Sequence, residues 1–268
     1  EVFKEYTDMI EPLSLDEAYL DVTDSDLHSG SATLIARNIK QDIKAKTGLT
    51  ASAGVSYNKF LAKIASDMDK PDGLYVIRPE QGAEFIEQLP IGKFYGIGKA
   101  TEAKMLALDI KSGKDLKLWP REKLVSRFGK AGNYYYDIAQ GIDNRPVVSS
   151  RIRKSLGTET TFEHDLGDKQ HMVTVLNELA VKVAESMQRR NLHAKTLTIK
   201  VKYADFTQVT RSLTLEEAFS EVGSITPHLP GLLDKTEAGD KKVRLLGVTA
   251  SSFLSENEAD NQAQIDLL

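Results

Sequence analysis

Apolar and polar residues recur with a regular period over the first third of the chain, and that period switches between two residues and three to four. A two-residue period is typical of a half-buried strand, whereas a longer one is typical of an amphipathic helix. Strands are predicted at residues 13–23, 51–55 and 74–77, and helices between Gly30 and Gly48 and from Asn58 to the helix-breaking residues 70–73. Because strands alternate with helices, residues 1–78 are predicted to form an α/β unit.

The pattern becomes wholly helical over residues 79–144 and then alternates again. An extended stretch at 145–153 carries basic residues without acidic neighbours and is predicted to be a linker. Beyond it we predict strands at 152–162, 195–203, 207–214 and 243–253, a helix at 169–190, and a helical piece broken by Pro227 and Pro230. These elements form a βαββαβ set, so the predicted fold class is α+β with several domains. Residues 255–268 are predicted to be a flexible tail.

Composition narrows the class of protein without identifying it. The 268 residues are 41% hydrophobic and 28% charged, which is ordinary globular composition for about two domains. The absence of cysteine excludes a disulfide framework and any Cys-ligated metal site. No apolar run approaches the roughly 18 residues of a membrane span, so we expect a cytoplasmic protein without a membrane segment.

The net charge of −4 hides an uneven distribution along the chain. Residues 145–215 contain 12 Lys and Arg against 7 Asp and Glu, whereas residues 216–268 contain 4 against 10. A basic middle permits contact with a phosphate backbone although the whole chain is acidic. Ordinary unevenness among solvated faces explains the charges equally well, so charge alone leaves both interpretations open.

Asp16 and Glu17 are the first candidates for chemistry. Adjacent carboxylates suit Mg²⁺, which is usually held by one or two carboxylates together with substrate phosphates. Neighbours in a regular strand point to opposite faces, so both side chains reach one metal only where the backbone bends or bulges. The alternative is a solvated acidic pair on a hairpin, and the spacing alone favours that alternative.

A glycine-rich turn, Gly96-Ile97-Gly98-Lys99, joins two short predicted helices. Backbone N–H groups at such a turn, with the positive end of the second helix, can bind one phosphate. Thr101 stands where a Rossmann motif needs its third glycine, and no strand precedes the turn, so a dinucleotide site is excluded. A plain helix hairpin is the alternative. Lys59, Lys63 and Lys70 are explained by an ordinary helix surface and helix end.

In collinear order these segments resemble the Y-family DNA polymerases, in particular their DinB-like (DNA polymerase IV) group. SLDEAYLDVT (residues 14–23) resembles the second catalytic motif of the family, and NKFLAKIASDM and KPDG (58–68 and 70–73) resemble the rest of its palm. RKSLG (153–157) and RLLGV (244–248) are similar to the first and last strands of its little finger. The resemblance implies a partial palm at 1–78, a thumb with a helix-hairpin-helix at 79–144, a linker at 145–153, a little finger at 154–254 and a tail at 255–268.

The resemblance implies template-directed DNA synthesis of the error-prone, damage-bypassing (translesion) type. Two Mg²⁺ ions would assist the attack of a primer 3′-hydroxyl on the α-phosphate of a deoxynucleoside triphosphate (dNTP), with pyrophosphate leaving. By the same resemblance Asp16 would bridge the two ions, Glu17 would bind the ion that activates the hydroxyl, and Lys70 would hold the triphosphate.

The resemblance also implies that the partner is primer–template DNA. Its phosphates would be gripped by the turn at Gly96 and by the polar face of the little-finger sheet, which positions the DNA without reading its sequence. The expected DNA contacts are Ser14, Gly96, Gly98, Lys99, Arg151, Arg153, Lys154, Thr196, Thr198, Lys200, Lys202, Arg211 and Arg244.

The end of the chain resembles the short peptide by which bacterial polymerases bind the sliding clamp. Gln264 is followed, after a short spacer, by the hydrophobic pair Leu267 and Leu268. Two leucines can fill an apolar pocket while the glutamine fixes the register by hydrogen bonding. A frayed terminus whose leucines pack within the chain is the alternative.

The family pattern begins with a strand that carries a further metal-binding Asp, followed by the fingers. Neither precedes the segment with Asp16 and Glu17, so we expect this chain alone to be an inactive, monomeric fragment. A helix-hairpin-helix DNA-binding or repair module would explain the turn at Gly96 but not the two carboxylates. A structural interaction protein would explain only the acidic ends.

Overall fold

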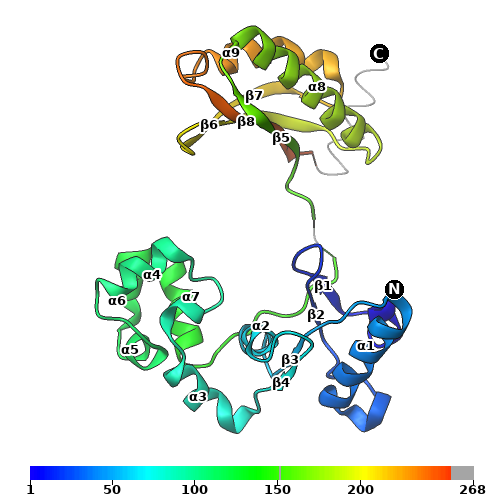
Figure 1. The fold of residues 1–268 in the computed structure, drawn as a ribbon, viewed down its shortest axis with the longest axis vertical. Coiled ribbons are helices and arrows are strands. Elements are labelled where there is room, and N and C mark those ends of the chain that lie inside the picture. Colours follow the sequence, from blue (N-terminus) through cyan, green and yellow to red (C-terminus); the bar gives the residue numbers. More distant parts are fainter. Residues whose placement is uncertain (151, 255–268) are drawn as a thin grey trace. The chain divides into compact units, whose positions relative to one another are not determined.

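The computed structural model describes residues 1–150 and 152–254, and the chain divides into two compact units, Glu1–Arg151 and Ile152–Leu268. Figure 1 shows both units, which are described separately below. No helix in the described part of the chain is long and apolar enough to span a membrane.

Unit 1 starts with a short 3-10 turn (Val2–Glu5) and a β-hairpin of β1 (Ile10–Pro12) and β2 (Ala18–Leu20). The two strands are antiparallel, with Glu11 opposite Tyr19. The predicted continuous strand at 13–23 is therefore wrong, because its first residues form the hairpin turn. The N–H groups of Leu13 and Ser14 both donate to the carbonyl of Glu17, which closes this turn.

A βαβ arrangement follows the hairpin, as the sequence predicts. Strands β3 (Ala53–Val55) and β4 (Leu74–Val76) are parallel and are joined by helix α2 (Lys59–Met68). Helix α1 (Ala32–Thr47) precedes them, capped by the Ser31 side chain at its start and by Gly48 (φ +75°) at its end. Only a residue without Cβ adopts that φ readily, which is why the helix stops there.

The rest of unit 1 is helical, in agreement with the prediction. The elements are α3 (Pro79–Gln88), a 3-10 turn (Ile91–Lys93), α4 (Lys99–Leu106), α5 (Gly113–Lys117), α6 (Arg121–Phe128) and α7 (Ala131–Ala139). Buried residues of α2, among them Phe60 and Leu61, belong to the same hydrophobic cluster as those of the later helices. This shared core fixes α2 against the helical part of the unit.

Unit 2 is a four-stranded sheet with the order β5-β8-β6-β7, and all neighbours are antiparallel. Its strands are β5 (Ser155–Leu166), β6 (Ala194–Tyr203), β7 (Gln208–Phe219) and β8 (Val243–Phe253). Helices α8 (Lys169–Gln188) and α9 (Leu229–Leu233) lie on one side of the sheet, with 3-10 turns at Val222–Ser224 and Thr226–His228 (Figure 1). The predicted βαββαβ order is confirmed, although β5 starts later and β7 extends further than the sequence pattern indicates.

The sheet of unit 2 has one apolar and one polar face. Along β6 the inward residues Leu197, Ile199, Val201 and Tyr203 are buried against the helices, as predicted. The residues between them, which point to the opposite face, are polar and only partly buried. This alternation leaves one whole face of the sheet available for contacts outside the domain.

Candidate active site

Asp16 and Glu17 lie on the turn between β1 and β2 rather than within a strand. The Ser14 hydroxyl donates to Oδ1 of Asp16 at 2.7 Å and thereby orients this carboxylate. Asp16 is exposed and Glu17 is half-buried, and both line one cavity of about 530 Å³. The turn removes the strand alternation that would have sent the two carboxylates to opposite faces.

Two lysines also line this cavity, Lys63 on α2 and Lys70 just after the end of that helix. Lys63 Nζ lies 3.4 Å from Glu17 Oε1 and 2.9 Å from Asp67 Oδ2. Lys70 Nζ lies 2.6 Å from Asp67 Oδ1. Carboxylates and ammonium groups therefore alternate from Glu17 through Lys63 and Asp67 to Lys70.

The alternating charges of Lys63, Asp67 and their neighbours stabilise one another. Burial alone would lower the pKa of Lys63, but its hydrogen bond to Asp67 and the charges of Asp67 and Glu17 raise that pKa above its usual value. Burial alone would raise the pKa of Asp67, but hydrogen bonds from Lys70 and Lys63 lower it. Lys63, which the sequence presents as an ordinary helix lysine, is thus a member of the candidate site.

The carboxylates suit a divalent cation that is completed by a substrate. Among the residues described, no three His, Cys, Asp or Glu side chains gather closely enough to hold an ion. Asp16 and Glu17 nevertheless offer oxygen ligands at the rim of a cavity, and Mg²⁺ commonly takes one or two carboxylates and completes its shell with phosphates and water. Asp21 does not line this cavity, and its carboxylate accepts from the N–H and hydroxyl groups of Thr23.

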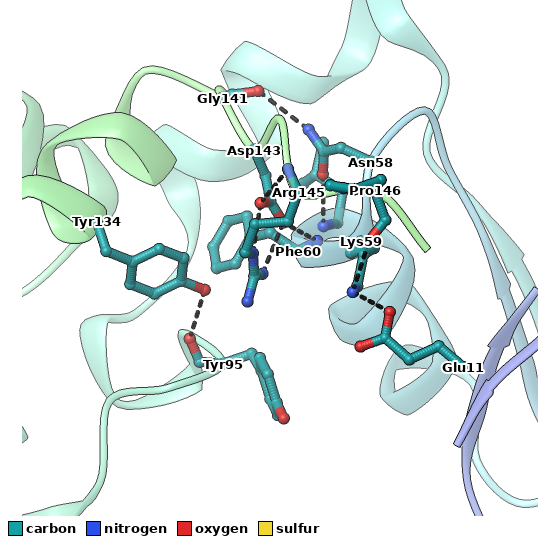
Figure 2. Close-up of polar contacts among 11 residues, drawn as sticks. Glu11, Asn58, Lys59, Phe60, Tyr95, Tyr134, Gly141, Asp143, Arg145 and Pro146 are labelled. Atoms are coloured by element: carbon teal, nitrogen blue, oxygen red, sulfur yellow. Dashed lines mark hydrogen bonds and ion pairs between the residues drawn. The ribbon is translucent and has the colours of Figure 1, made fainter. Parts of the chain in front are cut away.

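The start of α2 is anchored from a distant part of unit 1. Asn58 caps the helix by accepting from Leu61 N–H, and its side-chain amide donates to the carbonyl of Gly141. Asp143 accepts from Phe60 N–H at 2.9 Å and also forms an ion pair with Arg145, as Figure 2 shows. These contacts fix the helix that carries Lys63.

The glycine-rich turn lies between the 3-10 turn Ile91–Lys93 and α4. Gly96 has φ +92°, and Gly98 is the N-cap of α4 with open space where a Cβ would stand. The Lys99 side chain is 96% exposed. Its Nζ lies 3.1 Å from Glu102 Oε2, within the same helix. Open space and an exposed cation at a helix start are features that suit a phosphate-binding turn.

The polar face of the unit 2 sheet carries four of the expected DNA contacts. Thr196 Oγ1 lies 3.0 Å from Thr214 Oγ1, and Thr198 Oγ1 lies 2.8 Å from Ser212 Oγ. Lys200 forms an ion pair with Glu159, and Lys202 lies over the ring of Phe206. The cations are therefore held by local partners that a phosphate would have to replace.

The remaining basic candidates are placed differently from one another. Arg244 stacks on the same Phe206 ring and lies 3.7 Å from Asp165. Arg211 does not share the polar face, because it stands opposite buried Ile199 and its Nε donates to the carbonyl of Lys235. The expectation that Arg211 belongs to that face is wrong.

Several candidates lie outside the described residues or next to them. Arg153 and Lys154 are exposed ahead of β5. Arg151, Gln264, Leu267 and Leu268 lie outside the described residues.

Known protein families and curated relatives match nearly the whole chain. Residues 1–67 match the impB/mucB/samB family, residues 79–110 its helix-hairpin-helix motif, and residues 153–267 its C-terminal domain. DNA polymerase IV of Alkalilimnicola ehrlichii is 53% identical over 95% of this chain and 71% of its own length. DNA polymerase IV of Gluconobacter oxydans is 51% identical over 94% of this chain and 71% of its own length.

Solved structures give the same result. A chimera of the Y-family DNA polymerases Dbh and Dpo4 is 28% identical, with a TM-score of 0.83 over 94% of this chain and 73% of the chimera. An insertion ternary complex of Dbh DNA polymerase is 27% identical, with a TM-score of 0.61 over 94% of this chain and 73% of Dbh. This chain therefore belongs to the Y family of translesion, DNA-directed DNA polymerases, in its DNA polymerase IV (DinB) group.

Proposed function

We propose that Asp16 and Glu17 are the metal-binding catalytic carboxylates of this chain and that they act in nucleotidyl transfer to a primer 3′-hydroxyl. The observation that supports this assignment is that both side chains open into one cavity whose rim also carries Lys63 and Lys70. A cavity lined by both carboxylates and ammonium groups fits a metal-bound triphosphate better than a solvated hairpin does.

Two bound Mg²⁺ ions would neutralise phosphate charge and favour ionisation of the attacking hydroxyl. Asp16 would hold both ions, and the Ser14 hydroxyl keeps its carboxylate oriented. Glu17 would bind the ion on the primer side, while Lys63 limits repulsion between Glu17 and Asp67. The residues thus provide a fixed arrangement of charge before substrate arrives, which is the main source of electrostatic catalysis.

Lys70 is the candidate for contact with the triphosphate of a dNTP. Its side chain is half exposed, and its ion pair is formed with Asp67, three residues earlier. Asp67 keeps Lys63 as a second partner, so Lys70 can turn to a phosphate while the half-exposed Asp67 carboxylate still has a cation beside it.

Residues of both units would bind the DNA. We assign a partial palm to residues 1–78, a thumb to 79–144, a linker to 145–153 and a little finger to 154–254. The turn at Gly96 would bind one backbone phosphate, and the polar face of the sheet would bind others through Lys200 and Lys202. Their number determines how steeply DNA affinity falls with salt.

The sliding clamp is the proposed partner of the last residues. This proposal rests on the sequence, in which Gln264 precedes Leu267 and Leu268. A peptide of residues 258–268 is expected to bind the clamp, whereas the same peptide with both leucines changed to Ala is not. Equal binding by the two peptides, or binding by neither, would contradict the proposal.

Primer extension by the complete gene product tests the catalytic assignment. Asp16→Asn and Glu17→Gln are expected to lower kcat by at least about 100-fold, with DNA affinity within a few-fold of the original. Asp24→Asn, a matched change of an exposed carboxylate just beyond the hairpin, is expected to leave kcat unchanged. Extension at the original rate by either active-site variant would remove that residue from the site.

A further inference from the structure

Lys59, the first residue of α2, is a buried charge that the catalytic assignment does not use. It is only 9% exposed, although lysine is almost never buried without a specific partner. Its Nζ forms an ion pair with Glu11 and donates to the carbonyl of Pro146 at 3.1 Å, and both contacts are drawn in Figure 2. The ammonium also lies 4.9 Å from the centre of the Tyr19 ring.

These partners come from both strands of the catalytic hairpin. Glu11 lies on β1 and Tyr19 lies on β2, directly opposite each other in the strand register. Lys59 therefore contacts each strand of the hairpin whose turn carries Asp16 and Glu17. A shift of the hairpin relative to α2 would separate a buried ammonium from its carboxylate, which is costly.

The same carboxylate also holds the start of the linker, residues 145–153. Glu11 Oε2 accepts from Val148 N–H at 2.8 Å as well as from Lys59. Residues 142–150 have no helix or strand of their own, yet Val147 is buried and Pro146 is bound to Lys59. One ion pair thus joins the hairpin, the first turn of α2 and the segment that leads to unit 2.

The ionisation of Glu11 supports this arrangement. Burial opposes the charged form, but hydrogen bonds from Lys59 and from the Val148 N–H, with the charges of Lys59 and Arg145, lower the pKa of Glu11 below its ordinary value. The carboxylate is therefore charged at neutral pH and can serve both donors.

We propose that Lys59 and Glu11 are positioning residues for polymerisation, and that together they hold the catalytic hairpin and the start of the linker in one fixed arrangement. This role rests on the proposed function of Asp16 and Glu17, because the hairpin matters only if its turn carries the catalytic carboxylates. Neither Lys59 nor Glu11 needs to touch substrate.

Two variants separate positioning from simple stability. Glu11→Ala leaves the Lys59 charge buried without its partner and is expected to destabilise unit 1. The double variant Glu11→Ala/Lys59→Met removes both charges together, so that no charge is left buried without its partner. It still removes the acceptor of Val148 N–H and the ion pair that joins the hairpin to α2. The matched control is Glu5→Ala/Lys46→Met, which removes an ion pair whose side chains are about half exposed.

Hydrogen exchange of the Val148 amide in this chain reports on the linker, because this N–H donates to Glu11. Both Glu11 variants are expected to exchange about 10-fold faster there, while the control pair exchanges at the original rate. In primer extension by the complete gene product, the double variant is expected to lower kcat about 10-fold with an unchanged KM for nucleotide, because a displaced hairpin misplaces the reacting groups.

A double variant with original exchange, or one with original kcat, would overturn the proposal. Asp16→Asn separates this outcome from the proposed function, because it leaves the ion pair intact and is expected to leave exchange of the Val148 amide unchanged. An active Asp16→Asn variant would contradict the catalytic assignment, whereas the exchange result would still decide whether the linker is anchored by Glu11.

Discussion

At the residue scale, the site depends on which carboxylates share which cations. The sequence identifies Asp16 and Glu17 by residue type, but it does not indicate that Lys63 bridges Glu17 and Asp67. Glu17 and Lys63 are far apart along the chain, and only the packing of α2 beside the hairpin brings them together. The two carboxylates can therefore be proposed from the sequence of one motif, whereas the cation that lies between Glu17 and Asp67 is visible only in the structure.

Lys70 gives the sharpest residue-level prediction. Lys70→Gln is expected to raise the KM for dNTP about 10-fold with a smaller change in kcat, because it removes a ground-state contact with the triphosphate. Stability is expected to change little, since Asp67 keeps its ion pair with Lys63. Steady-state primer extension measures both constants, with Lys46→Gln as an exposed control. An unchanged KM would mean that Lys70 does not contact the triphosphate and is an ordinary lysine at a helix end.

At the element scale, local signals predicted helix ends better than strand ends. Ser31 with Gly48 and the cap Asn58 mark helix boundaries that the structure reproduces. The alternation of residues 13–23 was misleading, because its first residues form a turn that is closed by the carbonyl of Glu17. A period of two residues does not reveal where a chain reverses. The same limit explains Arg211, whose face is set by its register with β6.

Asp143 links the start of α2 to the acid stability of unit 1. Burial alone would raise the pKa of Asp143, but its hydrogen bonds and ion pair with Arg145, together with Phe60 N–H, lower it below the ordinary value of 3.8. A lowered folded-state pKa means that the stabilisation is complete above pH 3.8 and is lost as the pH falls through the lowered value.

The melting temperature of unit 1 is therefore expected to fall as the pH is lowered from 3.8 through the lowered pKa of Asp143. At neutral pH, Asp143→Asn is expected to lower the free energy of unfolding by about 1–3 kcal/mol and the melting temperature with it. In acid, the melting temperature of this variant is expected to depend less on pH. Asp109→Asn, at an exposed carboxylate, is the control. A pH profile of Asp143→Asn parallel to the original would contradict the assignment. Thermal unfolding followed by circular dichroism from pH 2.5 to about 7 covers the relevant range.

At the scale of the whole molecule, DNA affinity is predicted to depend on salt through the polar face of unit 2. Lys200→Ala/Lys202→Ala is expected to reduce the slope of log affinity against log salt by up to about 1.8, because each neutralised phosphate contributes about 0.9. The control Lys182→Ala/Arg189→Ala removes the same charge from α8 and its C-cap, which lie on the opposite side of the sheet. Fluorescence anisotropy with primer–template duplex provides the slopes. Equal slopes for the two double variants would place the interface elsewhere.

The central claim is that Asp16 is a metal ligand, and a change of ligand chemistry tests it most directly. The chain has no cysteine, so Asp16→Cys introduces a single thiol at the site. Thiolate is a poor ligand for Mg²⁺ and a better one for softer ions such as Mn²⁺. The measurement is primer extension by the complete gene product carrying Asp16→Cys, in each metal. We predict almost no extension with Mg²⁺ and partial recovery with Mn²⁺; original activity with Mg²⁺, or an equal loss with both metals, would contradict the assignment.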